Sequence, residues 1–250
     1  MEIFDILMNR RTIREYLDKD VDDELLKKIL AAGCRASTTG GMQVYSIIIT
    51  RDKEKKKELL PIHFDQKMIM EAPVVLTFCA DFNRFNKWCR FRKAEPGYDN
   101  FISFFTAAID ALLVAQTVSI AAEASGLGIC YLGTTTYNAD KIIEVLKLPK
   151  GVVPVTTITL GWPAEMPQQV DRLPLEAIIH NETYKDYSPE DIDRFYNEKE
   201  KRDDSLQFIK ENNKETLAQV FTDVRYRKDD NILFSKTLLK VLEDQGFMNQ

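Results

Sequence analysis

One long apolar segment, running from Asp99 to Gly126, limits the folds open to this chain more than any other feature of the sequence. It consists almost entirely of helix-forming residues, and its apolar side chains would lie on all sides of the helix, which indicates burial on most sides. Asp110, Gln116 and Glu123 interrupt the segment, so it is too polar to span a bilayer. The sequence therefore predicts a globular chain with one long helix in its core and no membrane partner.

Small side chains form one ridge of this helix. Ala107, Ala111, Ala115 and Ser119 recur every four residues, and so permit the close approach of a second backbone. The pattern fits a tight crossing within the chain and a dimer seam equally well.

Three strands are predicted at residues 45–50, 73–80 and 152–160, because β-branched and other apolar residues dominate each segment. The helices predicted around them are a short one at Ile3 to Met8, one that Gly33 ends, a charged one at residues 51–60, and one that Asn138 or Asp140 caps before Pro149. Because helices separate the strands, the sequence favours an α+β or mixed α/β arrangement.

Charge and cysteine usage exclude several classes of partner. The 250 residues carry 34 Lys+Arg against 39 Asp+Glu, a formal net charge of -5, so no nucleic acid is expected as a partner. The N-terminus lacks the features of a signal peptide, which makes a cytoplasmic location the expectation. The four cysteines form no CxxC pair and have no nearby histidine. We therefore expect free, mostly buried thiols and no metal site.

A basic turn follows the first predicted helix. Arg10, Arg11 and Arg14 lie close together there, and guanidinium groups so placed suit bidentate binding of a phosphate. The same residues also fit an exposed turn whose arginines pair with Glu15 or Asp18.

Two polar loops could bind a ligand or merely connect elements. In the first, Ser37, Thr38 and Thr39 offer hydroxyl groups, and Gly40-Gly41 allows a ligand to approach the backbone. The second contains Gly133-Thr134 ahead of a helix. Neither loop has the spacing of a P-loop or a Rossmann fingerprint.

The sequence offers no acid-base or nucleophile set. His63 and His180 are its only histidines, and no G-x-S-x-G motif occurs. Lone histidines are more often structural. Loops suited to phosphate and a polar heterocycle, without catalytic side chains, fit an enzyme whose cofactor performs the reaction.

A series of motifs along the whole chain resembles the nitroreductase family. The motifs are RRTIREY, ASTTGGMQVYSIII, Gln66-Lys67, FCADFNR, AAEASGLGICYLG, VTTITLGWP, DRLP at residues 171–174, and HNETY from His180. In this order and spacing they are similar to those of the oxygen-insensitive NADPH nitroreductases and NADPH-flavin oxidoreductases, the larger subgroup with a C-terminal extension.

The resemblance implies an α+β fold with a central, mostly antiparallel sheet flanked by helices, assembled as an intertwined homodimer with FMN sites at the interface. Residues 1–250 would form a single FMN-binding domain, of which about residues 175–250 make a C-terminal helical extension. On this view the small-residue ridge is interpreted as the dimer seam.

The resemblance also assigns residues to FMN by position. The phosphate would be held by Arg14 and Arg172, and the ribityl chain and ring would be contacted by Arg10, Arg11 and Thr12. The partner subunit would contribute Ser37, Thr38 and Thr39. The flavin ring would be contacted by Gln66 and by the segment Tyr131, Leu132, Gly133 and Thr134, whose backbone N–H groups can stabilise charge on the reduced ring.

The chain departs from the family pattern at three places. Val170, followed by Asp171, stands where relatives often carry a lysine that contacts the phosphate, two residues before the arginine of the R-L-P motif. Gly40-Gly41 replaces a bulky aromatic residue over the flavin, which should open the substrate pocket. The loop that selects NADPH over NADH is matched only in part, by Lys199, Lys201 and Arg202, so NADPH preference is an expectation.

The expected function is therefore that of an FMN-dependent oxidoreductase, which takes electrons from NADPH and reduces nitroaromatic or quinone-like acceptors by a ping-pong mechanism. No side chain is expected to act as a catalytic acid or base. The alternatives are a flavin or quinone reductase with incidental nitro activity, and a non-catalytic flavin-binding protein.

Overall fold

The computed structural model describes residues 2–250, which divide into two compact units. The first unit comprises Met1–Gln169 and Phe234–Gln250, and the second comprises Val170–Leu233. Every strand of the described chain belongs to the first unit. The first unit therefore supplies the framework on which most of the predicted site residues lie.

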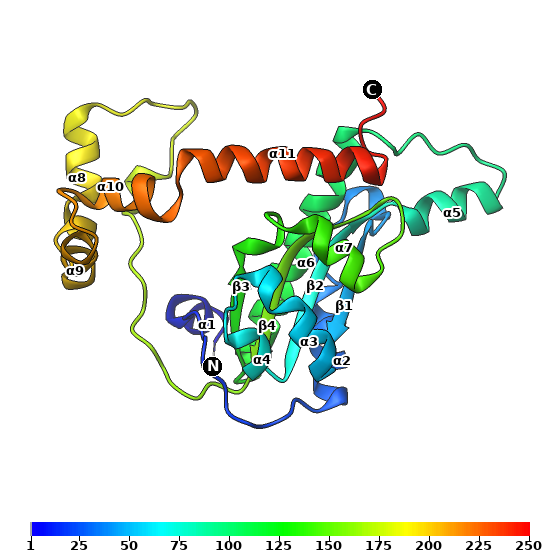
Figure 1. The fold of residues 1–250 in the computed structure, drawn as a ribbon, viewed down its shortest axis with the longest axis horizontal. Coiled ribbons are helices and arrows are strands. Elements are labelled where there is room, and N and C mark those ends of the chain that lie inside the picture. The colour runs from blue at the N-terminus through cyan, green and yellow to red at the C-terminus, as the bar shows by residue number, and fades with distance from the viewer. Residues whose placement is uncertain (1) are drawn as a thin grey trace. The chain divides into compact units, whose positions relative to one another are not determined.

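The first unit contains one four-stranded antiparallel sheet (Figure 1). The strands are β1 (Tyr45–Thr50), β2 (Val74–Asp81), β3 (Gly128–Leu132) and β4 (Val152–Gly161), in the order β1-β2-β4-β3. The three predicted strands agree with β1, β2 and β4 to within one residue at either end, and the expected antiparallel sheet is confirmed. The sequence does not indicate β3, because this strand is five residues long and follows the end of the long helix directly.

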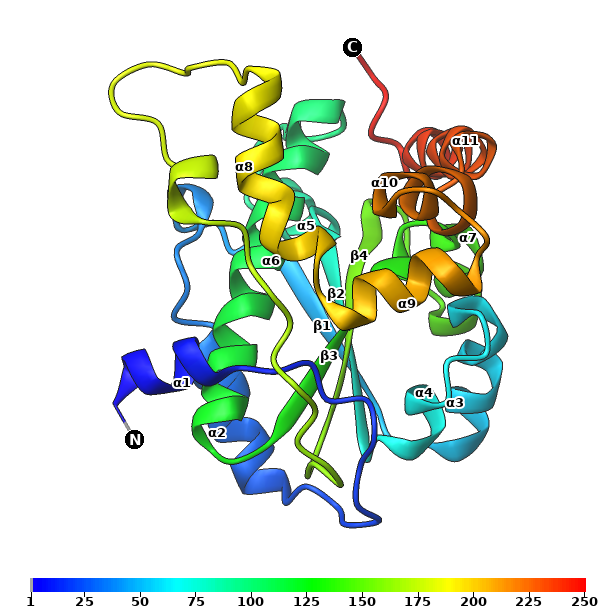
Figure 2. The ribbon, with the colours of Figure 1, turned by 90° about the vertical axis from the view of Figure 1, so that its left-hand side faces the viewer.

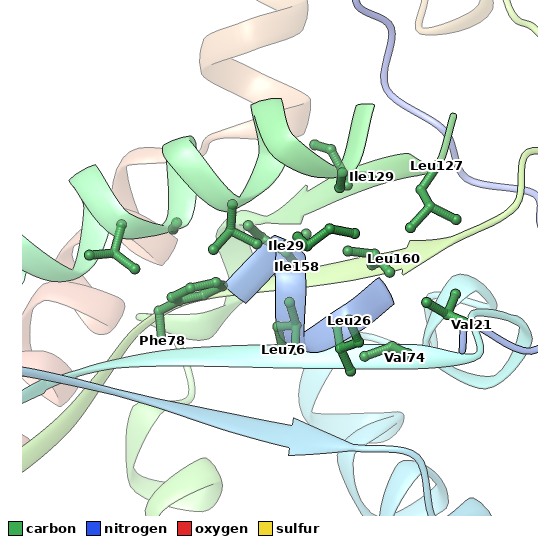
Figure 3. Packing of buried hydrophobic residues seen from close by; sticks show 14 of the residues in the cluster. Val21, Leu26, Ile29, Val74, Leu76, Phe78, Leu127, Ile129, Ile158 and Leu160 are labelled. Atoms are coloured by element: carbon green, nitrogen blue, oxygen red, sulfur yellow. The ribbon is translucent and has the colours of Figure 1, made fainter. Parts of the chain in front are cut away.

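Helices cover both faces of the sheet (Figure 2). In chain order they are α1 (Ile3–Asn9), α2 (Asp23–Gly33), α3 (Lys53–Leu59), α4 (Met68–Glu71), α5 (Asn83–Phe91), α6 (Phe101–Ala124) and α7 (Ala139–Leu146), with 3₁₀ turns η1 (Thr39–Gly41), η2 (Pro61–His63) and η3 (Gly133–Thr135). On one face α2 and α6 pack against the sheet, and on the other α3, α4 and α7 do so. Figure 3 shows the first of these cores, in which side chains of α2, such as Leu26 and Ile29, meet those of the strands, such as Leu76 and Ile158.

The small-residue ridge of α6 faces the interior of its own chain. Ala107, Ala111, Ala115 and Ser119 have no exposed surface. Ala111 and Ala115 pack in the core that also contains α2 and the strands. The ridge therefore forms a tight intramolecular crossing, and its interpretation as a dimer seam is wrong. Small side chains are needed there because α6 must approach α2 and the sheet closely.

Gly33 has a different role from the one that the sequence indicates. The helix does end at this residue, but the following Cys34 keeps right-handed helical angles, so no left-handed cap is formed. A Cβ atom at Gly33 would lie 2.1 Å from Cγ2 of Val118 on α6. The glycine is therefore required by the close packing of α2 against α6.

The opposite face of α6 is apolar and exposed. It consists of Phe101, Ile102, Phe105, Ile109, Leu112 and Leu113, each 41–65% exposed. Within the described chain, α6 is also the one helix long and apolar enough to cross a membrane by length and composition, so the expectation that it is too polar for this is wrong, although half of its apolar window is buried. Core helices of globular proteins share these properties.

The second unit is helical. It contains η4 (Leu175–Ala177), α8 (Pro189–Glu200), α9 (Asp203–Glu211), α10 (Leu217–Val220), the π-turn η5 (Phe221–Arg225) and the beginning of α11 (Lys228–Gln245). Capping boxes start α8 at Ser188 and α10 at Thr216. The end of α11 belongs to the first unit, where Val241, Leu242 and Phe247 join a buried cluster with Ala107 and Val153.

Candidate cofactor-binding site

The basic N-terminal segment is fixed along the edge of the sheet. The backbone N–H of Ile13 donates to the carbonyl of Ile129 on β3 at 3.0 Å, and Thr12 forms a parallel bridge with the same residue. Ile13 is buried, and a Cβ atom at Gly128 would lie 2.4 Å from its side chain. The absence of a side chain at Gly128 therefore lets the segment pack directly on β3, and this packing fixes the backbone from which the arginine side chains extend.

Two of the three arginines have unsatisfied buried nitrogens. Arg10 and Arg11 are half-buried, and the Nε atom of each is buried without a hydrogen-bond partner in the described chain. Arg10 also pairs with Glu123 of α6 at 3.3 Å. Both arginines line a cavity of about 220 Å³ beside Gly128. Arg14 is exposed, and Thr12 is half-buried.

The pairing of Arg10 with Glu123 argues against a simple exposed turn. None of the salt bridges formed by residues 2–250 joins Arg10, Arg11 or Arg14 to Glu15 or Asp18. Burial raises the pKa of Glu123, and the neighbouring Arg10 opposes this rise. Arg10 and Arg11 are thus held in a partly buried setting, in which their Nε atoms lack an acceptor that a polar or anionic ligand could supply.

The loop at Ser37, Thr38 and Thr39 is anchored by a buried carboxylate. The Thr38 hydroxyl donates to Oδ2 of Asp110 at 2.5 Å, and both the backbone N–H and the hydroxyl of Thr39 donate to Oδ1, at 3.0 and 3.2 Å. Asp110 is 1% exposed. Both threonine hydroxyls therefore donate to Asp110, whereas the hydroxyl of Ser37, an exposed residue, is the one that does not.

Gly40 and Gly41 shape the end of this loop. Their φ angles are +56° and +69°, a left-handed conformation that other residues rarely adopt, and Gly41 has open space where a side chain would begin. The two glycines therefore leave the surface beside the loop uncovered, as expected for an open pocket.

A second loop brings the predicted flavin-ring residues together. Thr134 lies in η3, and its hydroxyl is 2.7 Å from Nδ1 of His63 in η2. Gln66 is half-buried and donates from its side chain to the His63 carbonyl at 2.9 Å. The predicted cap Asn138 begins α7, but its side chain donates to the carbonyl of Ile62 at 2.8 Å instead of capping the helix.

Tyr131, Leu132 and Gly133 lead into this turn from β3. Leu132 is buried, whereas Gly133 is exposed, with no atom within 4 Å of the place that a Cβ would occupy. The Tyr131 hydroxyl lies 3.4 Å from both Ser119 and Gln116 of α6. The backbone at Gly133 is therefore accessible to a ligand. The sequence does not identify His63 or Asn138 as part of this arrangement, since neither belongs to a recognisable motif.

Burial of His63 predicts a pH-dependent stability. The side chain has no exposed surface, and this burial lowers its pKa to about 4 from the ordinary 6.5. The neutral ring is thus favoured in the folded chain, while the unfolded chain takes up a proton below pH 6.5. The free energy of unfolding therefore holds its full value above pH 6.5. As the pH falls from 6.5 towards 4, protonation of His63 in the unfolded chain lowers this free energy by roughly 3 kcal/mol.

The measurement is the free energy of unfolding by urea between pH 7.5 and 4.5 for the wild type and for His63→Asn. Carboxylates also titrate in this range, but they are common to both proteins. We expect the wild type to lose more stability than the variant on acidification. Equal losses would contradict a buried, neutral His63.

The remaining predicted residues lie in the second unit. Arg172 is exposed and donates to the Asp171 carbonyl at 2.8 Å. The Asp171 carboxylate pairs with Lys199 at 3.0 Å, so this departure from the family pattern neutralises a cation. Arg202 pairs with Asp204 through two hydrogen bonds of 2.9 and 3.0 Å.

Arg172, Lys199 and Arg202 line one cavity of about 310 Å³, whereas Lys201 is exposed and does not line it. The structure thus brings together three of the four cations predicted in this unit. Two of these three already have carboxylate partners, which lowers the charge that they present to a ligand.

The antiparallel sheet with helices on both faces defines an α+β protein, and the loops at the edge of the sheet form its candidate binding site. Residues 7–162 match the model of the nitroreductase family. The chain belongs to the nitroreductase family.

Relatives with assigned activities are similar over most of their length. The FMN reductase (NADPH) of Bacillus subtilis (strain 168) is 36% identical over 71% of this chain and 72% of its own. The oxygen-insensitive NADPH nitroreductase of Salmonella typhimurium is 34% identical over 72% and 74%. A solved structure from Bacteroides fragilis NCTC 9343 is 60% identical, with a TM-score of 0.97, and the match covers 98% of this chain and 100% of that one.

Proposed function

We propose that this chain is an FMN-dependent oxidoreductase that uses NADPH to reduce nitroaromatic or quinone-like acceptors. The observation that carries the proposal is the pair of buried, unpartnered Nε atoms of Arg10 and Arg11 beside the sheet edge, in a chain of the nitroreductase family. Nitrogens of this kind favour a ligand that carries oxygen acceptors. The relatives named for FMN and NADPH support the same cofactor and donor.

The donor set fits FMN. Arg14 and Arg172 would hold the phosphate, and Arg10, Arg11 and Thr12 would contact the ribityl chain and the ring. The partner subunit would contribute Ser37, Thr38 and Thr39. Gln66 and the segment Tyr131, Leu132, Gly133 and Thr134 would contact the ring. When bound, FMN supplies two-electron redox chemistry between a nicotinamide nucleotide and an electron acceptor.

The side chains act by binding and electrostatics. Guanidinium groups stay protonated at any ordinary pH, so the arginines attract the phosphate and transfer no proton. His63 is buried and neutral, which makes it a poor proton donor. Solvent reaches the exposed backbone of Gly133 and can supply protons. Lys199, Lys201 and Arg202, with Gly40 and Gly41, would contact the nucleotide or the acceptor.

The decisive experiment is an absorbance spectrum of the purified protein, followed by anaerobic addition of NADPH. Flavin bands that bleach on addition would support the proposal. Bands that do not bleach would favour a non-catalytic flavin-binding protein. A colourless protein that takes up no added FMN would refute the assignment.

A second candidate keeps the flavin but makes the protein mainly a flavin or quinone reductase. The open surface at Gly40 and Gly41 favours it, because this surface would accept acceptors larger than a nitroaromatic ring. Initial rates with free FMN, a quinone and a nitroaromatic would separate the two. A nitro compound preferred by less than roughly tenfold would favour the second candidate.

Replacing Arg172 by alanine is expected to raise the Kd for FMN about 10- to 100-fold, because one charge-assisted contact to the phosphate is lost. Fluorescence titration of the apo-protein measures this. Lys141→Ala, an exposed change on α7, is the control. Unchanged affinity in the Arg172 variant would show that the phosphate lies elsewhere.

We also propose that the chain forms a homodimer through the exposed apolar face of α6. Six large side chains exposed on one face of a helix are unusual for a monomer. Replacing both Phe105 and Ile109 by aspartate is expected to yield a monomer in analytical ultracentrifugation, with loss of FMN, while the exposed Lys141→Asp stays dimeric. A variant that remains dimeric would rule this face out.

A cytoplasmic location is proposed because NADPH and free thiols are both maintained there.

A further inference from the structure

Two side-chain hydrogen bonds join the segments that carry the predicted flavin-ring residues. The His63 ring lies 2.7 Å from the Thr134 hydroxyl, and Asn138 donates to the carbonyl of Ile62 at 2.8 Å. Gln66 lies shortly after Ile62 and His63 in the chain, and its side-chain amide donates a hydrogen bond to the His63 carbonyl. The segment that contains Gln66 is therefore linked to the turn at Gly133 and Thr134 through His63 and Asn138, which belong to none of the family motifs.

A histidine at position 63 is unusual if the residue serves only to pack the interior. Its side chain has no exposed surface, and Nε2 has no hydrogen-bond partner in the described chain. Whichever ring nitrogen carries the proton, only one of the two is satisfied by Thr134. An apolar side chain would avoid this unsatisfied nitrogen, so packing alone does not account for the histidine.

The backbone around His63 is also constrained. The 3₁₀ turn that contains it ends in two consecutive residues with left-handed angles, Phe64 and Asp65, both at φ 55°. This left-handed conformation is uncommon in residues other than glycine, and it persists where surrounding contacts hold the backbone in place. These two residues form the whole link between His63 and Gln66, so a contact that holds His63 also holds one end of this short link.

We propose that His63 is a positioning residue for the flavin ring: by binding Thr134, it holds the Gly133–Thr134 turn and Gln66 at a fixed separation on the two sides of the ring site. This inference rests on the proposed function, because it takes FMN as the ligand of that site. His63 itself does not touch the reacting atoms. Its effect is transmitted through the Thr134 hydroxyl and through the backbone that leads to Gln66.

The test uses variants that remove the bond from either end. Thr134→Val keeps the shape of the side chain and removes the hydroxyl, and His63→Leu removes the ring. His63→Asn is the rescue variant, because its amide can occupy the place of Nδ1. Thr136→Val is the matched control, since it makes the same change in the same loop two residues away, at a half-buried position.

The measurements are the Kd for FMN, the visible absorption of the bound flavin, and the thermal unfolding of each apo-protein. We expect Thr134→Val and His63→Leu each to raise the Kd about tenfold and to shift the flavin bands, because the ring environment changes. The double variant should bind FMN no more than about threefold more weakly than either single variant, since both changes act through one bond. His63→Asn should recover most of the affinity and the wild-type spectrum.

Three results would overturn the inference. One is a wild-type spectrum and Kd in both His63→Leu and Thr134→Val. Another is a loss of affinity in His63→Leu that His63→Asn does not recover. The third is a loss equalled by Thr136→Val, which would indicate general destabilisation of the loop. If the wild type binds no FMN, the proposed function itself fails, so the two failures are distinguishable.

Discussion

Replacing Gly128 by valine is expected to weaken FMN binding about 100-fold and to lower the free energy of unfolding by about 3 kcal/mol. A Cβ atom at this position would lie 2.4 Å from Cγ1 and 2.6 Å from Cβ of Ile13. Neither atom is the end of a flexible chain, so the N-terminal segment must move away from β3. The movement would break the hydrogen bond from Ile13 to Ile129 and displace the arginines on either side.

Urea unfolding and fluorescence titration with FMN measure the two effects. Gly97→Val is the control, because Gly97 is exposed, has an ordinary φ angle and has no neighbouring atom within 4 Å of the place that a Cβ would occupy. It makes the same chemical change without a clash. A Gly128 variant that binds FMN as tightly as this control would show that the docking of the arginine segment on β3 does not matter for the cofactor.

Local sequence patterns predict the elements of this fold well. The β-branched run at residues 45–50 forms β1 as expected, and the largely apolar segment from residue 99 forms the long helix α6. Each of these elements is visible in a short window, because the period of apolar residues indicates its type. The expected burial of the long helix on most sides is wrong, since one apolar face of α6 is exposed. The antiparallel arrangement of the sheet came from the resemblance, and the strand pairing confirms it.

Contacts between distant residues are not visible in such windows. His63 and Thr134 are 71 positions apart, and Thr38 and Asp110 are 72 apart. The close approach of Gly33 to Val118 likewise depends on how two helices cross. The ridge of small residues on α6 shows the same limit: its spacing reveals that a backbone comes close, but only the packing shows that this backbone belongs to the same chain.

Cation pairing also escapes prediction from the sequence. Arg10 pairs with Glu123, which is more than a hundred residues away, while the adjacent acidic candidates Glu15 and Asp18 are not used. In the second unit, Val170 stands where a phosphate-binding lysine is expected, and the neighbouring Asp171 pairs with Lys199. The family motif predicts which residues carry charge there, whereas the structure shows how much of that charge is already compensated.

The second large effect is expected at Asp110. Replacing it by alanine should destabilise the fold by about 3 kcal/mol, because the change leaves the Thr38 hydroxyl and two Thr39 donors without their acceptor. The carboxylate is 1% exposed, so water does not readily replace it. The loop that contains Ser37 would lose its anchor to α6, and we expect FMN affinity to fall as well.

Asp110→Asn separates the hydrogen bonds from the charge. The asparagine oxygen can still accept from Thr39, but its amide nitrogen cannot accept from the Thr38 hydroxyl, so about half of the loss should remain. Asp140→Ala, at an exposed position in the first turn of α7, is the control for removing a carboxylate. Urea unfolding measures the stability of the four proteins. We expect the wild type and Asp140→Ala to be the most stable, Asp110→Asn to be less stable, and Asp110→Ala to be the least stable. If Asp110→Ala is as stable as the wild type, the loop is held by its own backbone turn, and the predicted contribution of Ser37 to the cofactor site does not depend on α6.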